Sequence, residues 1–247
     1  MLLDTPTLLL FLMILPVISF LYASVGHGGA SGYLALMALF SFPNEMMKQT
    51  ALLLNLFVAG ISFYHYYKAG HFKKGLFIPF AIGSVPAAFL GGTLSLEPSV
   101  YKRILGVLLV FAVIRMLWKG ATDESKIKPV KTFQALFVGT AVGFFSGLIG
   151  IGGGIILTPL ILLLHWGNMK EAAAVSALFI WVNSASGLLG QFSSGVTLVP
   201  ISGLMVVIAV LGAIGGSYLG SQKWNNKFLE YFLAFVLTTA SLKLLIF

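Results

Sequence analysis

The segment Gly150-Ile151-Gly152-Gly153-Gly154, set inside a long apolar stretch, decides the fold of this 247-residue chain. A related segment, Gly26-His27-Gly28-Gly29, lies 124 residues earlier. Glycine loses the most conformational freedom on ordering and has no side chain to pack, so each cluster indicates a broken helix or a very close backbone approach. Two such breaks at matching places indicate two related halves, an arrangement found in many membrane carriers.

The composition places the chain in lipid. Hydrophobic residues make up 58% of it and charged residues 9%, and the mean hydropathy is +0.99, which leaves too little polar surface for a water-soluble globule. Two apolar runs, 30–42 and 155–166, follow the glycine clusters and are short. Most of the other runs approach the roughly 20 residues that a spanning helix needs; they cover residues 7–25, 50–67, 76–94, 104–118, 133–149, 172–192, 198–220 and 228–247.

The two halves match beyond their glycine clusters. At offsets of 124 to 126 residues, the sequence pairs Asn44 with Asn168, Thr50-Ala51-Leu52 with Ser176-Ala177-Leu178, Gly70 with Gly195, and Gly91-Gly92 with Gly215-Gly216. Each half has an odd number of crossings whether its short helix crosses or re-enters, so the second half inserts upside down. The sequence thus predicts an all-α polytopic membrane protein of two inverted-topology repeats. Each repeat has a glycine-broken or re-entrant half-helix plus about three to four transmembrane helices.

The predicted divisions are repeat 1 over residues 1–118, a cytoplasmic linker over 119–132 and repeat 2 over 133–247. Ten Lys residues fall on one predicted face, against three Lys and Arg residues on the other; the ten are Lys68, Lys73, Lys74, Lys119, Lys126, Lys128, Lys131, Lys170, Lys223 and Lys227. Positive-inside bias makes the richer face cytoplasmic and puts both termini outside the inner membrane of the cell. The net charge of +8 therefore reflects how the chain is oriented in the membrane and does not indicate nucleic-acid binding.

The chain has no cysteine, which excludes disulfides, thiolate metal sites and a cysteine nucleophile. Its first residues, Met1-Leu2-Leu3-Asp4, lack a positive region, so we expect no cleaved signal peptide.

The glycine breaks are the predicted binding site. Unwound backbone at membrane depth must be buried in protein or line a wet cavity. The short helices expected to begin near Ala30 and Ile155 would point their first N–H groups into that cavity and attract an anion. The alternative is that the glycines only allow tight helix crossing. That second interpretation is our expectation for Gly91-Gly92 and Gly215-Gly216, which lie within long helices.

The second glycine cluster, with Pro159 five residues on and a weaker copy near Gly26, resembles the TauE/SafE family of sulfite exporters and related permeases. The first half differs from the second: His27 stands where the second half has Ile151, Ala30 replaces the last glycine, and no proline follows. The resemblance implies transport of small sulfur-containing anions such as sulfite or organosulfonates, usually outward.

Polar residues near the breaks complete the candidate site. His27 can change charge near neutral pH, so it suits anion binding or proton coupling, or else a structural hydrogen bond. Hydroxyl groups and amides could donate to an anion, or could bond to helix carbonyls or join helices. Lys48 could attract an anion, or be a solvated loop lysine. The predicted substrate-binding residues are Gly26, His27, Gly28, Gly29, Ser31, Thr50, Asn55, Gly150, Gly152, Gly153, Gly154, Ser176 and Asn183.

The leading hypothesis is a secondary carrier of a small anion, working by alternating access. The seven acidic residues lie almost entirely in loops or at helix ends, whereas a cation carrier usually needs a carboxylate in mid-membrane. Proton coupling through His27 and a sodium site made of carbonyls both stay open. An anion channel, or a permease for another small carboxylate or inorganic anion, is the alternative. No cofactor or metal site is expected, and a homodimer is compatible with the sequence.

An enzyme is not expected. An intramembrane serine protease would need a histidine on a later helix, and no histidine follows His165.

Overall fold

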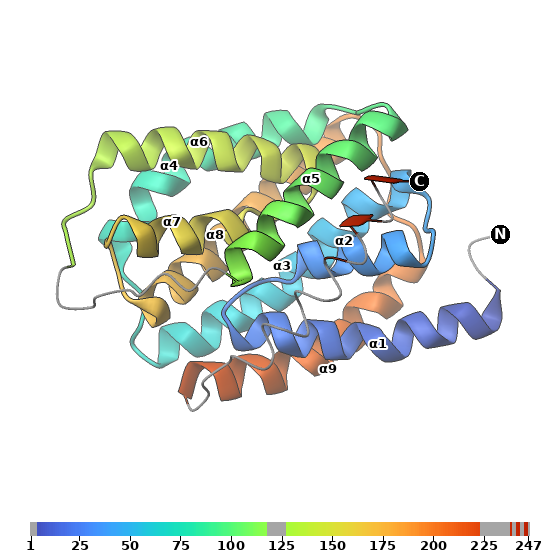
Figure 1. Cartoon of the computed structure of the whole chain (residues 1–247), viewed down its shortest axis with the longest axis horizontal. Helices are drawn as coiled ribbons and strands as arrows, with labels where there is room; N and C mark the ends of the chain where they lie inside the picture. The colour runs from blue at the N-terminus through green and yellow to red at the C-terminus, as the bar shows by residue number, and fades with distance from the viewer. Residues whose placement is uncertain (1–3, 118–126, 223–237, 239–240, 243–244, 247) are drawn as a thin grey trace.

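The computed structural model describes residues 4–117, 127–222, 238, 241–242 and 245–246 (Figure 1). Every regular element in the described ranges is an α-helix, which confirms the predicted all-α class. In chain order the helices are α1 (Thr5–Ser24), α2 (Ala30–Leu39), α3 (Asn44–Lys68), α4 (Lys74–Thr93), α5 (Pro98–Leu117), α6 (Thr132–Ile149), α7 (Gly154–Leu163), α8 (Met169–Ser193) and α9 (Ile201–Gln222).

Six of these helices, α1, α3, α4, α6, α8 and α9, are long and apolar enough to cross a membrane. Large apolar side chains cover the outside of the bundle, among them Ile82, Phe137 and Leu211, which are 64%, 71% and 67% exposed. A surface of this kind is suited to lipid and not to water. The predicted multi-pass membrane protein is therefore confirmed, while most of the expected last helix over 228–247 lies outside the described residues.

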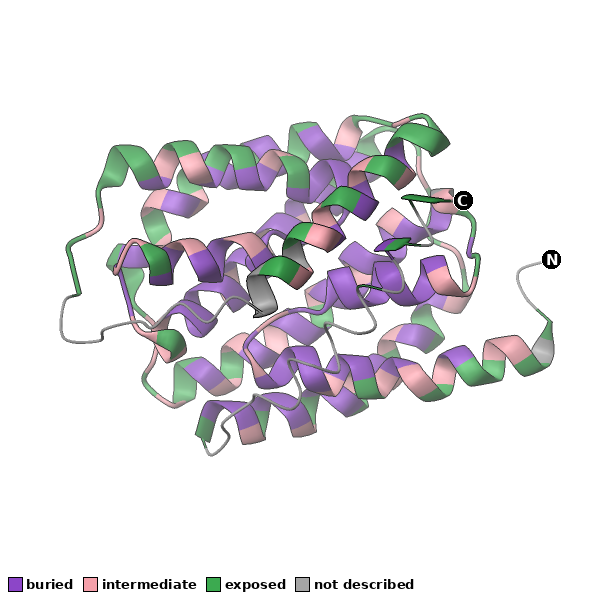
Figure 2. Ribbon diagram, viewed as in Figure 1, coloured by how far each residue is buried: buried purple, intermediate pink, exposed green. Residues whose placement is uncertain are grey.

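The helices form three layers (Figure 1). One layer holds α4 and α6, the opposite one holds α1 and α9, and the long helices α3 and α8 pack together between them. The two short helices accompany the central pair, α2 against α3 and α7 against α8. Buried residues concentrate in this central layer, as Figure 2 shows.

Glycines set the close spacing of the outer layers. A Cβ on Gly139 or Gly147 of α6 would overlap the carbonyl oxygens of Phe80 or Ala88 of α4, so the two helices run parallel in near backbone contact. The pair α1 and α9 is built the same way, with Gly212, Gly216 and Gly220 against the carbonyls of Pro16, Phe20 and Ser24. The predicted tight-crossing role is confirmed for Gly91, Gly92 and Gly216, while Gly215 meets only the ring of Phe20.

The central helices α3 and α8 run in opposite directions. Gly60 of α3 lies beside Trp181, and Gly187 of α8 lies beside Leu52. Each of the two helices has 25 residues, and each of α2 and α7 has 10. Matching helices that run antiparallel are what inverted repeats require; the repeats and their boundaries at 118 and 133 stay predictions.

Both short helices fold back beside the helix before them. The carbonyl of His165, just after α7, accepts a hydrogen bond of 2.7 Å from the N–H of Lys128, which lies just before α6. At the other short helix, Phe40 and Phe42 pack on Phe11 of α1, with ring centroids 5.7 and 4.7 Å apart. Each short helix therefore returns toward the end of the bundle at which the preceding long helix began.

We expect Gly147→Ala to lower the melting temperature of the purified protein, because its methyl group would force α6 away from the Ala88 carbonyl. Overpacking of this kind costs about 1–3 kcal/mol. Gly203→Ala is the matched control, since a Cβ there meets no atom within 4 Å. Equal melting temperatures for the two variants in the same detergent would contradict the close α4–α6 contact.

Candidate functional site

Both glycine clusters interrupt the helices, as the sequence predicts. The first break separates α1 from α2, and Gly26 and Gly29 there have φ values of 75° and 95°. The second separates α6 from α7, and Gly150, Gly152 and Gly153 there have φ values of 89°, 78° and 79°. Side-chain-bearing residues rarely adopt this left-handed conformation, so the breaks depend on glycine.

The two breaks, far apart in sequence, meet at one side chain. A Cβ on Gly28 would lie 2.5 Å from the amide oxygen of Asn55, and one on Gly152 would overlap the amide nitrogen of the same residue. The side chain of Ile180 closes the other side of both glycines. Asn55 is the twelfth residue of α3 and Ile180 the twelfth of α8, so an amide and a hydrocarbon occupy matching positions.

Among the residues that the structure describes, the Asn55 amide has no hydrogen-bond partner. It is 0% exposed, and neither its nitrogen nor its oxygen bonds to any of the residues that the structure describes. Leaving a buried polar group unpaired costs about 1–3 kcal/mol. A buried amide of this kind, enclosed by two backbone breaks, is a group that a ligand could satisfy.

The short helices supply further hydrogen-bond donors. Each begins at a glycine N-cap, Gly29 for α2 and Gly153 for α7, and neither end has a side-chain cap. The first N–H groups of a helix have no carbonyl within the helix to bond, and they carry the positive end of its dipole. Nearly all of α2 and the first two residues of α7 are buried, so these positive ends lie inside the protein.

His27 links the first break to the second half. Its Nδ1 lies 3.0 Å from the carbonyl oxygen of Val25, and its Nε2 lies 3.3 Å from Thr158 Oγ1 on α7. The Thr158 hydroxyl in turn donates to Ser176 Oγ on α8, at 2.8 Å. The ring also lies beside Gly154, the first residue of α7. A chain of imidazole and two hydroxyls therefore runs from the first break into the second half.

The structure brings only part of the predicted set together. His27, Gly28, Asn55, Gly152, Gly154 and Ser176 are joined by the contacts above. Gly29 and Gly153 are the N-caps beside them, while Gly26 lies against Ala173 and Gly150 against Lys48. Ser31, one residue into α2, donates to the hydroxyl of Tyr22.

Two predicted residues make their contacts elsewhere. Thr50 Oγ1 is 3.1 Å from the hydroxyl of Ser202 on α9. Asn183 donates to the carbonyl of Phe179 in its own helix and leaves its amide oxygen unpaired. The sequence pairing of Thr50 with Ser176 does not appear in their contacts.

Sequence reasoning missed Thr158 and Ile180. Thr158 had a signal, because it is a hydroxyl inside an apolar run and directly precedes Pro159 of the recognised motif. Ile180 had none, since an isoleucine in an apolar helix is ordinary and only the fold places it against both breaks.

Lys48 has a different role from either one expected. It lies within α3, and its ammonium donates to the carbonyls of Gly91, Gly92 and Leu94 at 3.3, 3.1 and 3.0 Å. The expectation of an anion-attracting or solvated loop lysine is wrong, because the Lys48 ammonium is hydrogen-bonded to carbonyls at the C-terminal end of α4.

Lys170 of α8 does the same for α9. Its ammonium donates to the carbonyls of Gly220 and Ser221. Each central long helix therefore supplies a lysine that caps the long helix after it.

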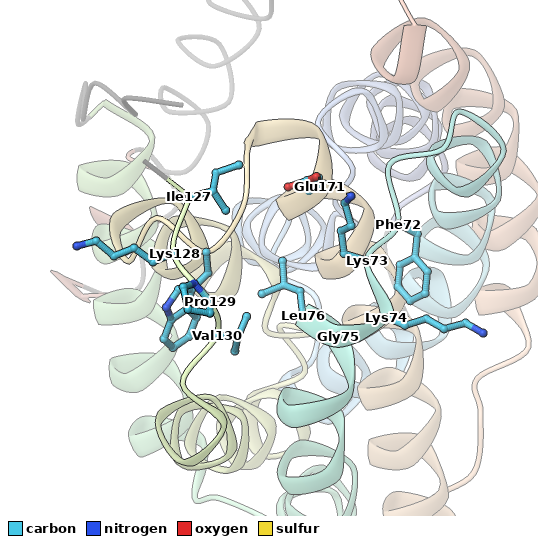
Figure 3. Close-up of a pocket in the computed structure, with 11 residues that line it drawn as sticks. Phe72, Lys73, Lys74, Gly75, Leu76, Ile127, Lys128, Pro129, Val130 and Glu171 are labelled. Carbon is cyan, nitrogen blue, oxygen red and sulfur yellow. Dashed lines mark ion pairs between the residues drawn. The ribbon is translucent and has the colours of Figure 1, made fainter. Parts of the chain in front are cut away.

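A separate pocket of about 470 Å³ lies at the bundle end where α4, α6 and α8 begin (Figure 3). Loops predicted to share the cytoplasmic face meet there, since Lys73 and Glu171 form an ion pair at 3.4 Å. Figure 3 shows these two side chains turned toward one another, while Lys74 and Lys128 extend away on opposite flanks. The pocket contains no residue of either glycine break, so we do not assign the substrate site to it.

Comparison with known proteins places the chain in a family. The model of the family described as "Sulfite exporter TauE/SafE" matches residues 10–244. The probable membrane transporter protein y4hK of Sinorhizobium fredii is 37% identical over 233 residues, covering 93% of this chain and 94% of that protein. The probable membrane transporter protein YjnA of Bacillus subtilis is 25% identical, covering 89% of this chain and 92% of that protein. No solved structure matches the chain.

The family match covers both glycine breaks and every described helix from the middle of α1 onward. The chain belongs to the TauE/SafE family of membrane transporters.

Proposed function

We propose that the protein is a secondary transporter of small sulfur-containing anions such as sulfite or organosulfonates, working mainly as an exporter. The observation that carries the proposal is the unpaired Asn55 amide, held where the two glycine breaks meet. The family description, which names sulfite export, supports the substrate class.

An anion suits the donors at this place. The amide nitrogen of Asn55, the first N–H groups of α7 and the Thr158 hydroxyl are donors that require no buried cation. Oxyanions carry several acceptor oxygens and can take bonds from donors on different helices at once. The described residues that meet the Asn55 amide are Gly28 and Gly152, which carry no negative charge to repel an anion.

Alternating access is the mechanism we propose. Gly28 and Gly152 allow the two breaks to close tightly on Asn55, and the antiparallel pair α3 and α8 forms the central contact between the halves. Tilting of one half against the other would open the site to one face at a time.

We propose the inner membrane as the location, with the end of the bundle that carries Lys73, Lys128 and Lys170 in the cytoplasm and the amino terminus outside. The ion pair Lys73–Glu171 and the hydrogen bond from Lys128 to His165 support a shared face for these loops. A reporter fused to the amino terminus would test this orientation.

Binding to purified protein tests the proposed function. The panel is sulfite, thiosulfate, sulfoacetate, phosphate and acetate, with choline as a cation control, and the readouts are thermal stabilisation and calorimetry. We expect the sulfur oxyanions to stabilise the protein and choline to have no effect, because a ligand that binds only the folded state raises the melting temperature. Stabilisation by choline and by no anion would overturn the proposal.

The alternative is an anion channel, or a permease for another small carboxylate or inorganic anion. Counterflow separates a carrier from a channel, since only a carrier exchanges external labelled anion against internal unlabelled anion through a saturable site.

A further inference from the structure

Resting on the proposed function, we infer that His27 binds one proton together with each anion, so that the protein is a proton–anion cotransporter. The observations are the position of the ring beside the first residue of α7 and its connection to Thr158 and Ser176.

The donor and acceptor roles of the groups around the His27 ring fit its doubly protonated form. A carbonyl oxygen can only accept, so the 3.0 Å contact with Val25 requires a proton on Nδ1. Thr158 has one hydroxyl proton and donates it to Ser176, so its oxygen is left to accept from Nε2. Both ring nitrogens therefore act as donors in this arrangement, which is the imidazolium form.

Loss of the proton on Nε2 has a simple structural consequence. The bare Nε2 becomes an acceptor, and Thr158 rotates its hydroxyl proton toward the ring and away from Ser176. No bond other than N–H and hydrogen bonds changes, and the released proton goes to water. The Thr158 hydroxyl can therefore satisfy the ring in either protonation state, as an acceptor or as a donor.

The anion supplies the coupling. An imidazolium in a membrane interior is costly without a compensating charge. An anion on the first turn of α7 lies next to His27, because a Cβ on Gly154 would be 3.5 Å from the ring carbon Cδ2. Proton and anion therefore stabilise one another, and by linkage each raises the affinity for the other. A monovalent anion and one proton together cross without net charge, so export proceeds while the outward anion gradient exceeds the inward proton gradient.

Several charged and titratable side chains of the surrounding helices bond to residues other than His27. On α1 and α3, the Tyr22 hydroxyl accepts from Ser31 and Tyr66 donates to the carbonyl of Ser24. On α8, Lys170 caps α9 and Glu171 pairs with Lys73. On α2, Tyr33 lies against Gly29. None of the bonds just described involves His27, and α7 meets the ring through the Thr158 hydroxyl and Gly154.

Proteoliposomes loaded with a pH-sensitive dye test the inference. The anion is sulfoacetate, or methanesulfonate as a fully ionised sulfonate that carries no proton itself. We expect wild-type uptake to acidify the lumen by one proton per sulfonate group, and any anion uptake that remains in His27→Gln to carry no proton. His65→Gln is the matched control, since His65 bonds to Ser217 on α9 and not to a glycine break. Acidification that persists in His27→Gln would overturn the inference.

A binding measurement covers the case in which His27→Gln does not transport. Calorimetry of methanesulfonate binding to wild type, in two buffers of different ionisation enthalpy, counts the protons taken up. We expect one proton per anion, and an affinity that falls about tenfold per pH unit once His27 is neutral in the free protein. Zero protons and a flat pH dependence with clear anion binding would refute the coupling alone. Absence of any anion binding would instead refute the proposed function, and the coupling with it.

Discussion

Replacing Asn55 with leucine is expected to weaken anion binding about a hundredfold, because hydrogen bonds to a charged group contribute about 1.5–3 kcal/mol each. Transport in proteoliposomes should fall below detection. The fold should survive, since the variant removes an amide that is 0% exposed and has no partner among the described residues. Without that unpaired group, the unliganded protein should melt at the same temperature or higher.

The combination of a stable fold and lost binding separates a ligand site from a structural amide. Gln191→Met is the control, because Gln191 is also buried on a central helix with an unpaired amide nitrogen, and its contacts lie away from the glycine breaks. It should bind the anion with wild-type affinity. Wild-type affinity in Asn55→Leu, or an equal loss in both variants, would contradict the assignment of Asn55.

Gly152→Ala should reduce transport at least tenfold. Its methyl group would overlap the Asn55 amide nitrogen and press on Ile180, so the second break could no longer close around the anion. The new side chain would also occupy a φ of 78°, which costs about 1–2 kcal/mol for a residue with a Cβ. The measurement is the initial rate of labelled anion uptake, normalised to the amount of folded protein.

Gly195→Ala separates these two effects. Gly195 has nearly the same φ, 82°, but a Cβ there meets no atom within 4 Å. It should lose stability through backbone strain and keep its transport rate. If both variants transport equally well, the close approach at Gly152 has no part in the mechanism.

The sequence predicted the fold well because the bilayer limits the choices. The apolar runs predicted α1, α4 and α6 to within about two residues, the uncertainty usual for helix ends. The glycine clusters predicted the two helix interruptions, since few other residues are accepted at positive φ. The start of α3 was placed six residues late, because its first turn is polar and the prediction followed hydropathy alone.

The site could be predicted only in part. Glycine clusters and buried polar residues are visible in a sequence, so His27, Asn55 and Gly152 were among the candidates. Which of them meet depends on how α3 and α8 are rotated about their axes and how far each is shifted along the bundle. A hydropathy pattern reports neither quantity. Asn55 lies at the crossing of the two breaks, while Thr50, about one and a half turns earlier, faces Ser202. Lys48 was misjudged because a lysine near a helix start looks solvated until the end of α4 is placed beside it.

Locating a bound anion tests the central claim most directly. Selenite resembles sulfite, and its selenium gives an anomalous signal in a crystal of the purified protein. The predicted result is one strong peak between Gly28 and Gly152, within hydrogen-bonding distance of the Asn55 amide nitrogen and the first N–H groups of α7. A peak confined to the pocket beside Lys73 and Lys128, with Asn55 still enclosed by the two glycines, would contradict it.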